Sequence, residues 1–392
     1  MNRIILKAGK DKSVFRYHPW IFSGAIAKTE GKIQEGELVK VYNSDNRYLA
    51  TGHYQIGSIA VRILSFEDIE INYDFWKNRI AQAYKMRCNL GLTTSATNNV
   101  YRLVHGEGDD MPGLVIDYYA GVAVVQFHSV GMYLERGNIA KALLEVMGDQ
   151  LTAIYDKSEG TLPYKAAIEP HNGYLYGKAE NFVALENGLK FNVDWLEGQK
   201  TGFFIDQREN RSLLEKYARD KHVLNMFCYT GGFSFYAMRG GACSVHSVDV
   251  SARAIELTKQ NAELNFPGDS RHEAFAEEAF RFLDHSRDKY DLIILDPPAF
   301  AKHQNVLNNA IQGYKKLNRK GIEVVKPGGI IFTFSCSQVM TKDLFRQTVF
   351  TAAANTGRKV RILHQLTQPA DHPINIYHPE GEYLKGLVLY VE

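Results

Sequence analysis

Two short stretches, Leu295-Asp296-Pro297-Pro298-Ala299-Phe300 and Phe334-Ser335-Cys336-Ser337, do most to decide the fold. Each closes an apolar run that predicts a buried parallel strand, over residues 291–295 and 329–334 respectively. In doubly wound α/β folds, ligands bind beyond the carboxyl ends of such strands, so the acid and the thiol are expected to face one crevice. The prolines stiffen the backbone, and the cysteine offers a nucleophile. Together these features indicate covalent chemistry on a planar base.

Composition places few limits on function. The 392 residues predict two or three domains, and 45% hydrophobic with 23% charged residues is ordinary for a globular protein. The four cysteines lack metal-ligand spacing, so we expect neither a disulfide framework nor a metal site, and a reducing cytoplasmic location. No apolar stretch is long enough to span a membrane. The net charge of +2 does not by itself indicate a nucleic-acid partner.

The pattern of elements predicts three domains. Residues 1–70 show short alternating strands and turns typical of a small β-barrel, and residues 71–190 are a mixed α/β region expected to position substrate. From 191 to 392, strands and helices alternate, which predicts a Rossmann-like doubly wound sheet.

A ligand-binding loop is predicted after the first strand of that sheet. The loop Phe227-Cys228-Tyr229-Thr230-Gly231-Gly232 contains two residues without side chains, which would let backbone approach a ligand. Asp249 lies 18 residues beyond Gly231 at the end of the next strand, where a carboxylate can bind ribose hydroxyls. The G-x-G-x-x-G pattern of diphosphate sites is missing, which favours a nucleoside without phosphate such as S-adenosylmethionine. The alternative is a tight turn with Asp249 capping a helix.

Two further sets of residues each have two interpretations. Glu278 could accept a hydrogen bond from an adenine amino group, or it could belong to an acidic first helical turn. The N-terminus is locally basic with interleaved aromatic residues, which could bind RNA phosphates and stack on bases. Alternatively, the basic residues form a solvated edge and the aromatic residues belong to the core. The candidates for RNA contact there are Lys7, Lys12, Arg16, His18 and Trp20.

These strings resemble a known family. Residues 225–233, Asp249, 296–300 and 334–337 are similar to class I S-adenosylmethionine-dependent RNA methyltransferases. The similarity is greatest to bacterial large-subunit ribosomal RNA cytosine-5 methyltransferases with an N-terminal PUA domain, and it extends over essentially the whole chain. Further matching strings are 12–24 at the PUA opening, 198–208 at the entry to the catalytic domain, and 370–373 and 379–386 near the C-terminus.

The resemblance implies a site and a partner. S-adenosylmethionine would lie along residues 227–232, Asp249 and Glu278, beside Asp296 and Pro297, with Gln207 and Arg208 lining the site. The partner would be large-subunit ribosomal RNA or an assembly intermediate, and the family also leaves a homodimer open. Two positions depart from the family: Glu278 stands where Asp is common, and Ala299 where Lys is frequent.

The resemblance also implies a mechanism for this chain. Cys336 would add to cytosine carbon 6 and thereby activate carbon 5 for methylation, while Asp296 would hydrogen-bond the polar edge of the base. Glu380 is the candidate base for the carbon-5 proton, with His372 and Lys385 as competitors. Alternatively, Glu380, His372 and Lys385 only order the C-terminal loop. Cys336 could likewise be an inert buried thiol.

Three other functions fit these residues less well. A methyltransferase for guanine N7 or an exocyclic amine needs no thiol at position 336, so Cys336 argues against it. An RNA-binding module with a vestigial cofactor site is disfavoured because the set Gly231, Gly232, Asp249, Asp296 and Cys336 is intact. A nicotinamide dehydrogenase is disfavoured by the missing glycine pattern and by the paired prolines.

Overall fold

The computed structural model describes residues 2–163, 168–180, 182–301 and 303–392. The chain divides into two compact units. The first unit contains Met1–Leu185, Val193–Ile205 and Ala370–Gly381, and the second contains Glu186–Asn192, Asp206–Pro369 and Glu382–Glu392. The segment 370–381 therefore belongs to the first unit, although the catalytic domain predicted over residues 191–392 includes it.

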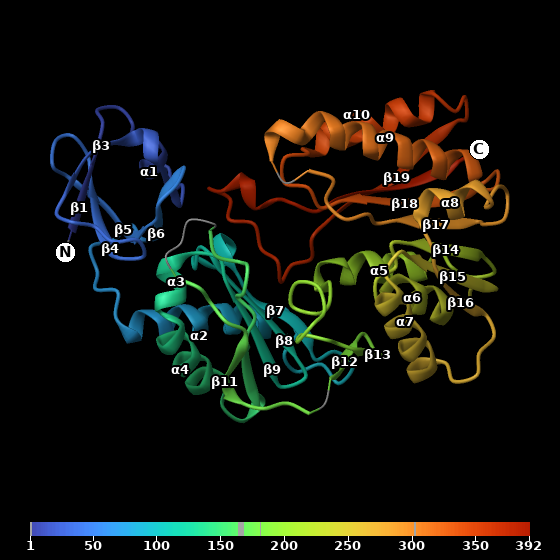
Figure 1. Ribbon diagram of the computed structural model, residues 1–392, viewed down its shortest axis with the longest axis horizontal. Coiled ribbons are helices and arrows are strands. Elements are labelled where there is room, and N and C mark those ends of the chain that lie inside the picture. The colour runs from blue at the N-terminus through green and yellow to red at the C-terminus, as the bar shows by residue number, and fades with distance from the viewer. Residues whose placement is uncertain (1, 164–167, 181, 302) are drawn as a thin grey trace. The chain divides into compact units, whose positions relative to one another are not determined.

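The first unit begins with a six-stranded sheet in the order β2-β6-β5-β4-β1-β3 (Figure 1). Apolar side chains of alternating strand positions, such as Ile4, Val39, Val41 and Val61, form its core. Because β1 pairs in parallel with β4 and antiparallel with β3, the sheet is mixed. Its elements are β1 (Asn2–Leu6), α1 (Lys12–Phe15), β2 (Trp20–Phe22), β3 (Ile26–Glu30), β4 (Leu38–Tyr42), β5 (Tyr48–Tyr54) and β6 (Ile59–Ser65).

A second sheet in the first unit has the order β11-β10-β9-β8-β7. Strands β8 and β9 form a hairpin, because they pair antiparallel around the turn at residues 120–121. Two short helices follow the hairpin, and Ser129 caps the first of them by accepting a hydrogen bond from the Met132 N–H. The elements are α2 (Tyr73–Asn89), β7 (Val100–His105), β8 (Leu114–Tyr119), β9 (Val122–Phe127), α3 (Val130–Leu134), α4 (Arg136–Met147), β10 (Ala153–Asp156) and β11 (Gly173–Gly177).

The second unit is built on a seven-stranded sheet in the order β16-β15-β14-β17-β18-β20-β19. The first five of these strands are parallel, whereas β20 runs antiparallel to both neighbours. The strands are β14 (His222–Met226), β15 (Ser244–Asp249), β16 (His272–Ala276), β17 (Leu292–Leu295), β18 (Gly329–Ser335), β19 (Val360–Thr367) and β20 (Lys385–Val391).

Helices cover both faces of this sheet, with α9 and α10 together on one face and α5, α6 and α7 on the other (Figure 1). The doubly wound, Rossmann-like fold predicted for this region is confirmed. The helices are α5 (Arg208–Glu215), α6 (Gly232–Arg239), α7 (Ala252–Asn265), α8 (Ala279–Asp284), α9 (Leu307–Val324) and α10 (Lys342–Ala354). A short hairpin of β12 (Val183–Glu186) and β13 (Leu189–Asn192) leads into this unit. No described helix combines enough length with enough apolar character to cross a lipid bilayer.

Candidate active site

The carboxyl ends of three adjacent strands bring the predicted chemical groups to one edge of the sheet. In the pairing register, Met226 of β14 lies opposite Leu295 of β17, and Leu295 lies opposite Thr333 of β18. Asp296 therefore follows β17 directly beside the loop that follows β14, and Cys336 follows the end of β18. The expectation that the acid and the thiol share one crevice agrees with this register.

The Asp296 carboxyl has an unusually high affinity for its proton. Burial disfavours its charged form and, together with the nearby Asp206 carboxylate, raises its pKa to about 7. One hydrogen bond, from Gln207 Nε2–H to Asp296 Oδ2 at 3.1 Å, partly opposes the shift. The Gln207 amide is itself held by the Asn210 side chain, which donates to its Oε1 at 2.6 Å. At neutral pH, both the protonated and the ionised form of Asp296 are therefore populated, and the side chain can donate or accept a hydrogen bond.

Cys336 lies in a setting that keeps its thiol protonated. Burial is the main cause, and the charges of Asp296 and Asp206 add to it, so the pKa of the thiol is raised to about 12. The flanking residues are fixed, since Ser335 and Ser337 are fully buried and the Ser337 hydroxyl donates to the Ala301 carbonyl. A nucleophilic role for Cys336 therefore requires a group that takes up the thiol proton.

Lys385 is a buried lysine whose charge interacts with that thiol. It begins β20 opposite Ser335, and its Nζ donates to the carbonyl oxygens of Ser337 at 2.6 Å and Met340 at 2.5 Å. The side chain is only 3% exposed, and burial lowers its pKa to about 8. Its charge lowers the pKa of the Cys336 thiol, so the two groups are electrostatically linked.

The glycines of the ligand-binding loop are needed for packing within the protein. A Cβ atom on Gly231 would lie 2.7 Å from the Phe235 ring, and one on Gly232 would lie 3.2 Å from the Arg211 side chain. Gly231 also has a φ of 83°, which favours glycine. A side chain at either position would therefore contact Phe235 or Arg211, and an approach of the glycine backbone to a ligand stays a prediction.

The same loop still presents backbone at the strand end in an unusual conformation. Phe227 and Tyr229 both have positive φ values, 58° and 48°. Asp249 stabilises this loop, because its Oδ2 accepts from the Tyr229 N–H at 3.0 Å and its Oδ1 from the Ser251 N–H at 2.9 Å. Asp249 does not cap the following helix, because the N-cap of α7 is Ser251, whose hydroxyl accepts from the Ala254 N–H at 3.3 Å. From the end of β15, the Asp249 carboxylate instead holds the loop that follows β14. Thr230 is buried, and its carbonyl accepts from the Asn261 amide at 3.0 Å.

Glu278 is the N-cap of α8. Its exposed side chain accepts a hydrogen bond from the Arg281 N–H at 2.9 Å, which is the helix-turn interpretation of this residue. A contact with adenine stays a prediction. Pro297 is buried directly after Asp296, and the Arg208 side chain is buried at the start of α5.

Asp206 belongs to the site, although it was not predicted as a site residue from the sequence. Its Oδ2 accepts from the Tyr383 hydroxyl at 2.7 Å, whereas its buried Oδ1 has no hydrogen-bond partner within the described part of the chain. Its charge raises the pKa of both Asp296 and Cys336. The only sequence signal was its place in the string 198–208.

Comparisons with known proteins agree with this geometry. A family model described as S-adenosylmethionine-dependent methyltransferase matches residues 101–378, and a PUA-like domain model matches residues 4–66. A protein of Vibrio vulnificus named ribosomal RNA large subunit methyltransferase I is 41% identical over 99% of both chains. The chain belongs to the S-adenosylmethionine-dependent methyltransferase family.

Solved structures support the same assignment. A Streptococcus mutans protein described as a SAM-dependent methyltransferase is 25% identical, with a TM-score of 0.86 over the full length of both chains. A second structure, a methyltransferase complexed with SAH, is 26% identical with a TM-score of 0.87 over the same coverage. The expected cofactor and the PUA-like N-terminal domain are therefore confirmed.

The second unit of this methyltransferase fits S-adenosylmethionine chemically. The cofactor carries a positive sulfonium and an ammonium group, and the unpaired buried oxygen of Asp206 offers a negative partner to a cation. Asp249 stands where a ribose diol would be bound in a doubly wound fold. Asp206, Asp249 and the backbone of residues 227–230 are the groups that would hold it.

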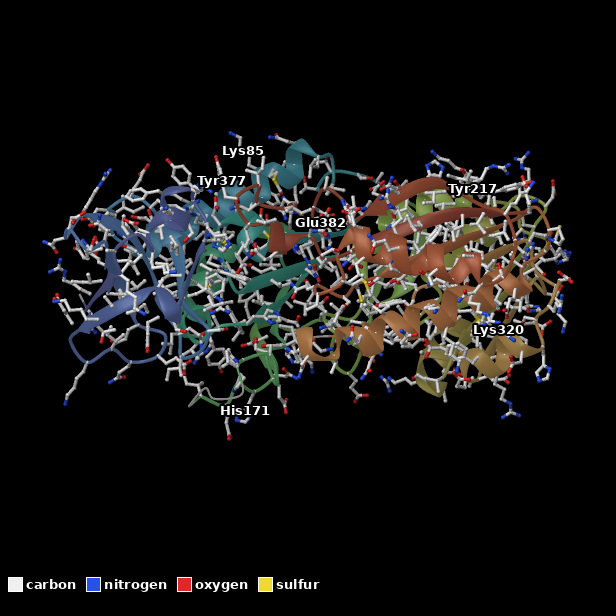
Figure 2. All side chains as sticks on the ribbon, turned by 90° about the horizontal axis from the view of Figure 1, so that it is seen from above. Lys85, His171, Tyr217, Lys320, Tyr377 and Glu382 are labelled. Carbon is white, nitrogen blue, oxygen red and sulfur yellow. The ribbon has the colours of Figure 1, made fainter. Side chains whose placement is uncertain are left out.

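The remaining site predictions fall in the first unit of the methyltransferase. Lys7, Lys12 and Arg16 are exposed, as an RNA contact requires, and the exposed aromatic residues Phe15, Tyr17 and Phe22 accompany them. His18 and Trp20 are instead half-buried, and Trp20 Nε1–H donates to Glu107 Oε1 at 2.8 Å. Tyr377, labelled in Figure 2, lies with its ring centroid 5.3 Å from that of Tyr17.

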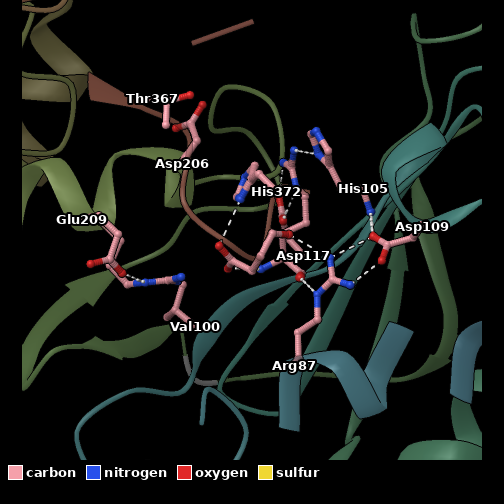
Figure 3. A network of polar contacts seen from close by, with 12 residues as sticks. Arg87, Val100, His105, Asp109, Asp117, Asp206, Glu209, Thr367 and His372 are labelled. Atoms are coloured by element: carbon pink, nitrogen blue, oxygen red, sulfur yellow. Dashed lines mark hydrogen bonds and ion pairs between the residues drawn. The ribbon is translucent and has the colours of Figure 1, made fainter. Parts of the chain in front are cut away.

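A buried polar network holds the segment 370–381 within the first unit (Figure 3). The Arg87 guanidinium makes a two-point ion pair with Asp109 and donates to the Asp371 carbonyl at 2.7 Å. The Asp371 side chain accepts from the Arg102 N–H at 3.0 Å and lies 3.2 Å from His372 Nδ1. His372 is thus a buried member of this network.

Glu380 also belongs to the first unit, where its carboxylate lies beside His18 and His378. Of the three candidate bases, Lys385 alone belongs to the same unit as Cys336 and Asp296.

Proposed function

We propose that this protein methylates carbon 5 of a cytosine in 23S ribosomal RNA through a covalent adduct of Cys336 at carbon 6. The observation that carries the proposal is the placement of Cys336 and Asp296 after adjacent parallel strands, electrostatically linked to each other. The choice of ribosomal RNA is supported by the names of full-length relatives from several bacteria, all ribosomal RNA large subunit methyltransferase I.

Lys385 is the group that we propose to take the proton from the Cys336 thiol. A neutral amine has two N–H groups, and the Ser337 and Met340 carbonyls accept two hydrogen bonds from Nζ. The lone pair of the neutral amine is then free to accept a proton. With a pKa of about 8, a substantial share of Lys385 is neutral near physiological pH, which suits a general base.

Asp296 would act as the acid that activates the ring. As the sulfur–carbon 6 bond forms, the π electrons of the carbon 5–carbon 6 bond move toward N3, and Asp296 donates its proton there. Its pKa of about 7 makes the protonated carboxyl available at neutral pH. The ring is then an enamine with a nucleophilic carbon 5.

Carbon 5 then takes a methyl group, which S-adenosylmethionine supplies when bound. A base removes the carbon-5 proton, N3 returns its proton to the Asp296 carboxylate, and the carbon 5–carbon 6 double bond re-forms as the bond to sulfur breaks. Glu380 remains the predicted base for the carbon-5 proton, and an unchanged rate in Glu380→Gln would exclude it. Access to the base requires a single-stranded or flipped cytidine.

A trapping experiment tests the covalent step. Ribosomal RNA with 5-fluorocytidine should give a stable protein–RNA adduct with S-adenosylmethionine, because fluorine replaces the proton that must leave before the thiol. Cys336→Ala should give no adduct, whereas Cys228→Ala, which removes the buried thiol of the loop after β14, should still form it. Adduct formation by Cys336→Ala would refute the assignment of the nucleophile.

A second variant separates the role of Lys385 from simple packing. Lys385→Met keeps most of the buried stem and removes the amine. Slow adduct formation at pH 7 that recovers as the pH rises would identify a proton acceptor, because hydroxide can replace it. A deficit that stays constant with pH would mean that Lys385 only positions the loop.

One observation favours a second candidate function. The high pKa of the Cys336 thiol is also what an inert packing residue would show. In that case the protein would methylate another base atom, such as guanine N7 or an exocyclic amine. A methylated product other than 5-methylcytidine, with full activity in Cys336→Ala, would establish that function.

A further inference from the structure

Two histidines and a glutamate that are far apart in sequence meet in the first unit. His18 precedes β2, while His378 and Glu380 flank the start of a short 3-10 turn, Pro379–Gly381. The distance from His18 Nε2 to Glu380 Oε2 is 3.4 Å, and that from His378 Nε2 to Glu380 Oε2 is 3.7 Å. One ligand atom from each of the three residues lies within 4.8 Å of the others.

The buried imidazole of His378 lacks the partners that burial normally requires. The residue is 3% exposed, yet neither ring nitrogen has a hydrogen-bond partner in the described part of the structure. The Trp20 ring covers it, with centroids 4.3 Å apart. Buried polar nitrogens are almost always satisfied, so an unpaired imidazole directed at a carboxylate and a second imidazole suggests a missing ligand.

We propose that His18, His378 and Glu380 form a binding site for a divalent transition-metal ion of the Zn²⁺ type. Two imidazoles and one carboxylate are a common ligand set for Zn²⁺, with ligand bonds of about 2.0–2.2 Å, so tetrahedral ligands lie roughly 3.3 Å apart. The two measured separations are close to this value. Glu380 keeps 47% of its side chain exposed, which leaves room for a water molecule as the fourth ligand.

The surroundings supply the orientation that a metal-bound histidine needs. His18 Nδ1 lies 3.3 Å from the Trp20 carbonyl oxygen and accepts from the Trp20 N–H at 3.2 Å, so both tautomers of His18 have a backbone partner. Metal binding through Nε2 selects the tautomer whose Nδ1–H donates to the carbonyl oxygen. The Glu107 carboxylate, held by Trp20, adds a negative charge near His378.

The ion would have a structural role. It would link the PUA-like sheet, through His18, to the segment 370–381, which also carries the buried Asp371. This role competes with the predicted role of Glu380 as the base for the carbon-5 proton, because a carboxylate that binds a metal ion is not available for that proton. Loss of Co²⁺ binding with an unchanged methylation rate in Glu380→Gln would decide for the metal. The proposal does not depend on which nucleotide is methylated.

Metal binding by the full chain tests the proposal directly. After chelator treatment and gel filtration, the wild-type protein should bind one Co²⁺ with the visible absorption of a tetrahedral site and without a sulfur charge-transfer band. Addition of Zn²⁺ should displace the Co²⁺ and raise the melting temperature. Glu380→Gln and His378→Asn should each weaken binding by at least roughly tenfold, as losses at metal sites do.

The control is His171→Ala, which removes an exposed imidazole outside the cluster (Figure 2) and should bind Co²⁺ like the wild type. Glu380→Gln preserves side-chain size, so its far-ultraviolet circular dichroism should match the wild type even if His378→Asn folds poorly. A wild-type protein that binds no Co²⁺ tetrahedrally would overturn the proposal. Unchanged affinity in Glu380→Gln would also overturn it.

Discussion

Replacing Asp296 by asparagine should stabilise this methyltransferase while it removes the proposed acid. The amide oxygen can still accept the hydrogen bond from Gln207, and the side chain keeps its size. What disappears is a carboxyl group that the folded protein is reluctant to ionise. The substitution should therefore increase the free energy of unfolding while it abolishes catalysis, so the two effects can be measured separately.

The size of the effect follows from the pKa of Asp296. Folding raises this pKa from 3.8 to about 7, which is roughly three units, and each unit corresponds to about 1.4 kcal/mol. Below pH 4 the carboxyl is protonated in both states, and the free energy of unfolding is unaffected. Between pH 4 and 7 only the unfolded state loses the proton, so stability is progressively lost. Above pH 7 the full penalty of about 4 kcal/mol applies.

Urea unfolding followed by circular dichroism, repeated from pH 4 to pH 9, measures this difference. The stability of Asp296→Asn relative to the wild type should grow between pH 4 and 7 and then stay level. In a 150–250-residue unit each kcal/mol shifts the melting temperature by about 2–4 °C, so the full penalty corresponds to roughly 8–16 °C. Asp220→Asn, at an exposed position of the second unit with a φ of 57° that asparagine tolerates, is the control.

A constant difference between wild type and Asp296→Asn over this pH range would refute the reasoning. It would mean that Asp296 ionises as readily in the folded chain as in the unfolded one. The proposed proton donation to the cytosine ring would then lose its physical basis.

Two other substitutions have clear expected results. Asp206→Asn removes a charge that raises the pKa values of Asp296 and Cys336. Alkylation of the Cys336 thiol by iodoacetamide, measured by peptide mass spectrometry, should therefore become faster at a given pH. A slower reaction would contradict this. Glu186→Gln leaves the buried Arg211 guanidinium without its two-point partner at 2.8 Å, and should cost about 3–5 kcal/mol in urea unfolding. A loss below about 1 kcal/mol would show that water or another group compensates.

Much of the fold was predictable because local patterns determine it. The strand leading to Asp296 is an apolar run, Leu292–Leu295, closed by two prolines, and the strand leading to Cys336 has the same character. Parallel strands in a doubly wound sheet have few arrangements, so the meeting of their ends follows from the order of elements. The antiparallel β20 carries no comparable signal, because its residues Lys385–Val391 could pair at several places.

The site was less predictable where it depends on distant residues. Lys385 enters the site only because β20 pairs with β18, which places it opposite Ser335. His18 and His378 are 360 residues apart, and a sequence pattern cannot show that their side chains meet. Glu278 shows the opposite case, since a carboxylate before a helix is usually a cap, and here it is one.

Transfer of labelled methyl groups to ribosomal RNA from a strain that lacks this protein, followed by nucleoside analysis, tests the central claim most directly. The account predicts 5-methylcytidine as the product, formed by the wild type and by Cys228→Ala and absent with Cys336→Ala. A different methylated nucleoside, or 5-methylcytidine formed undiminished by Cys336→Ala, would contradict the covalent mechanism proposed for Cys336.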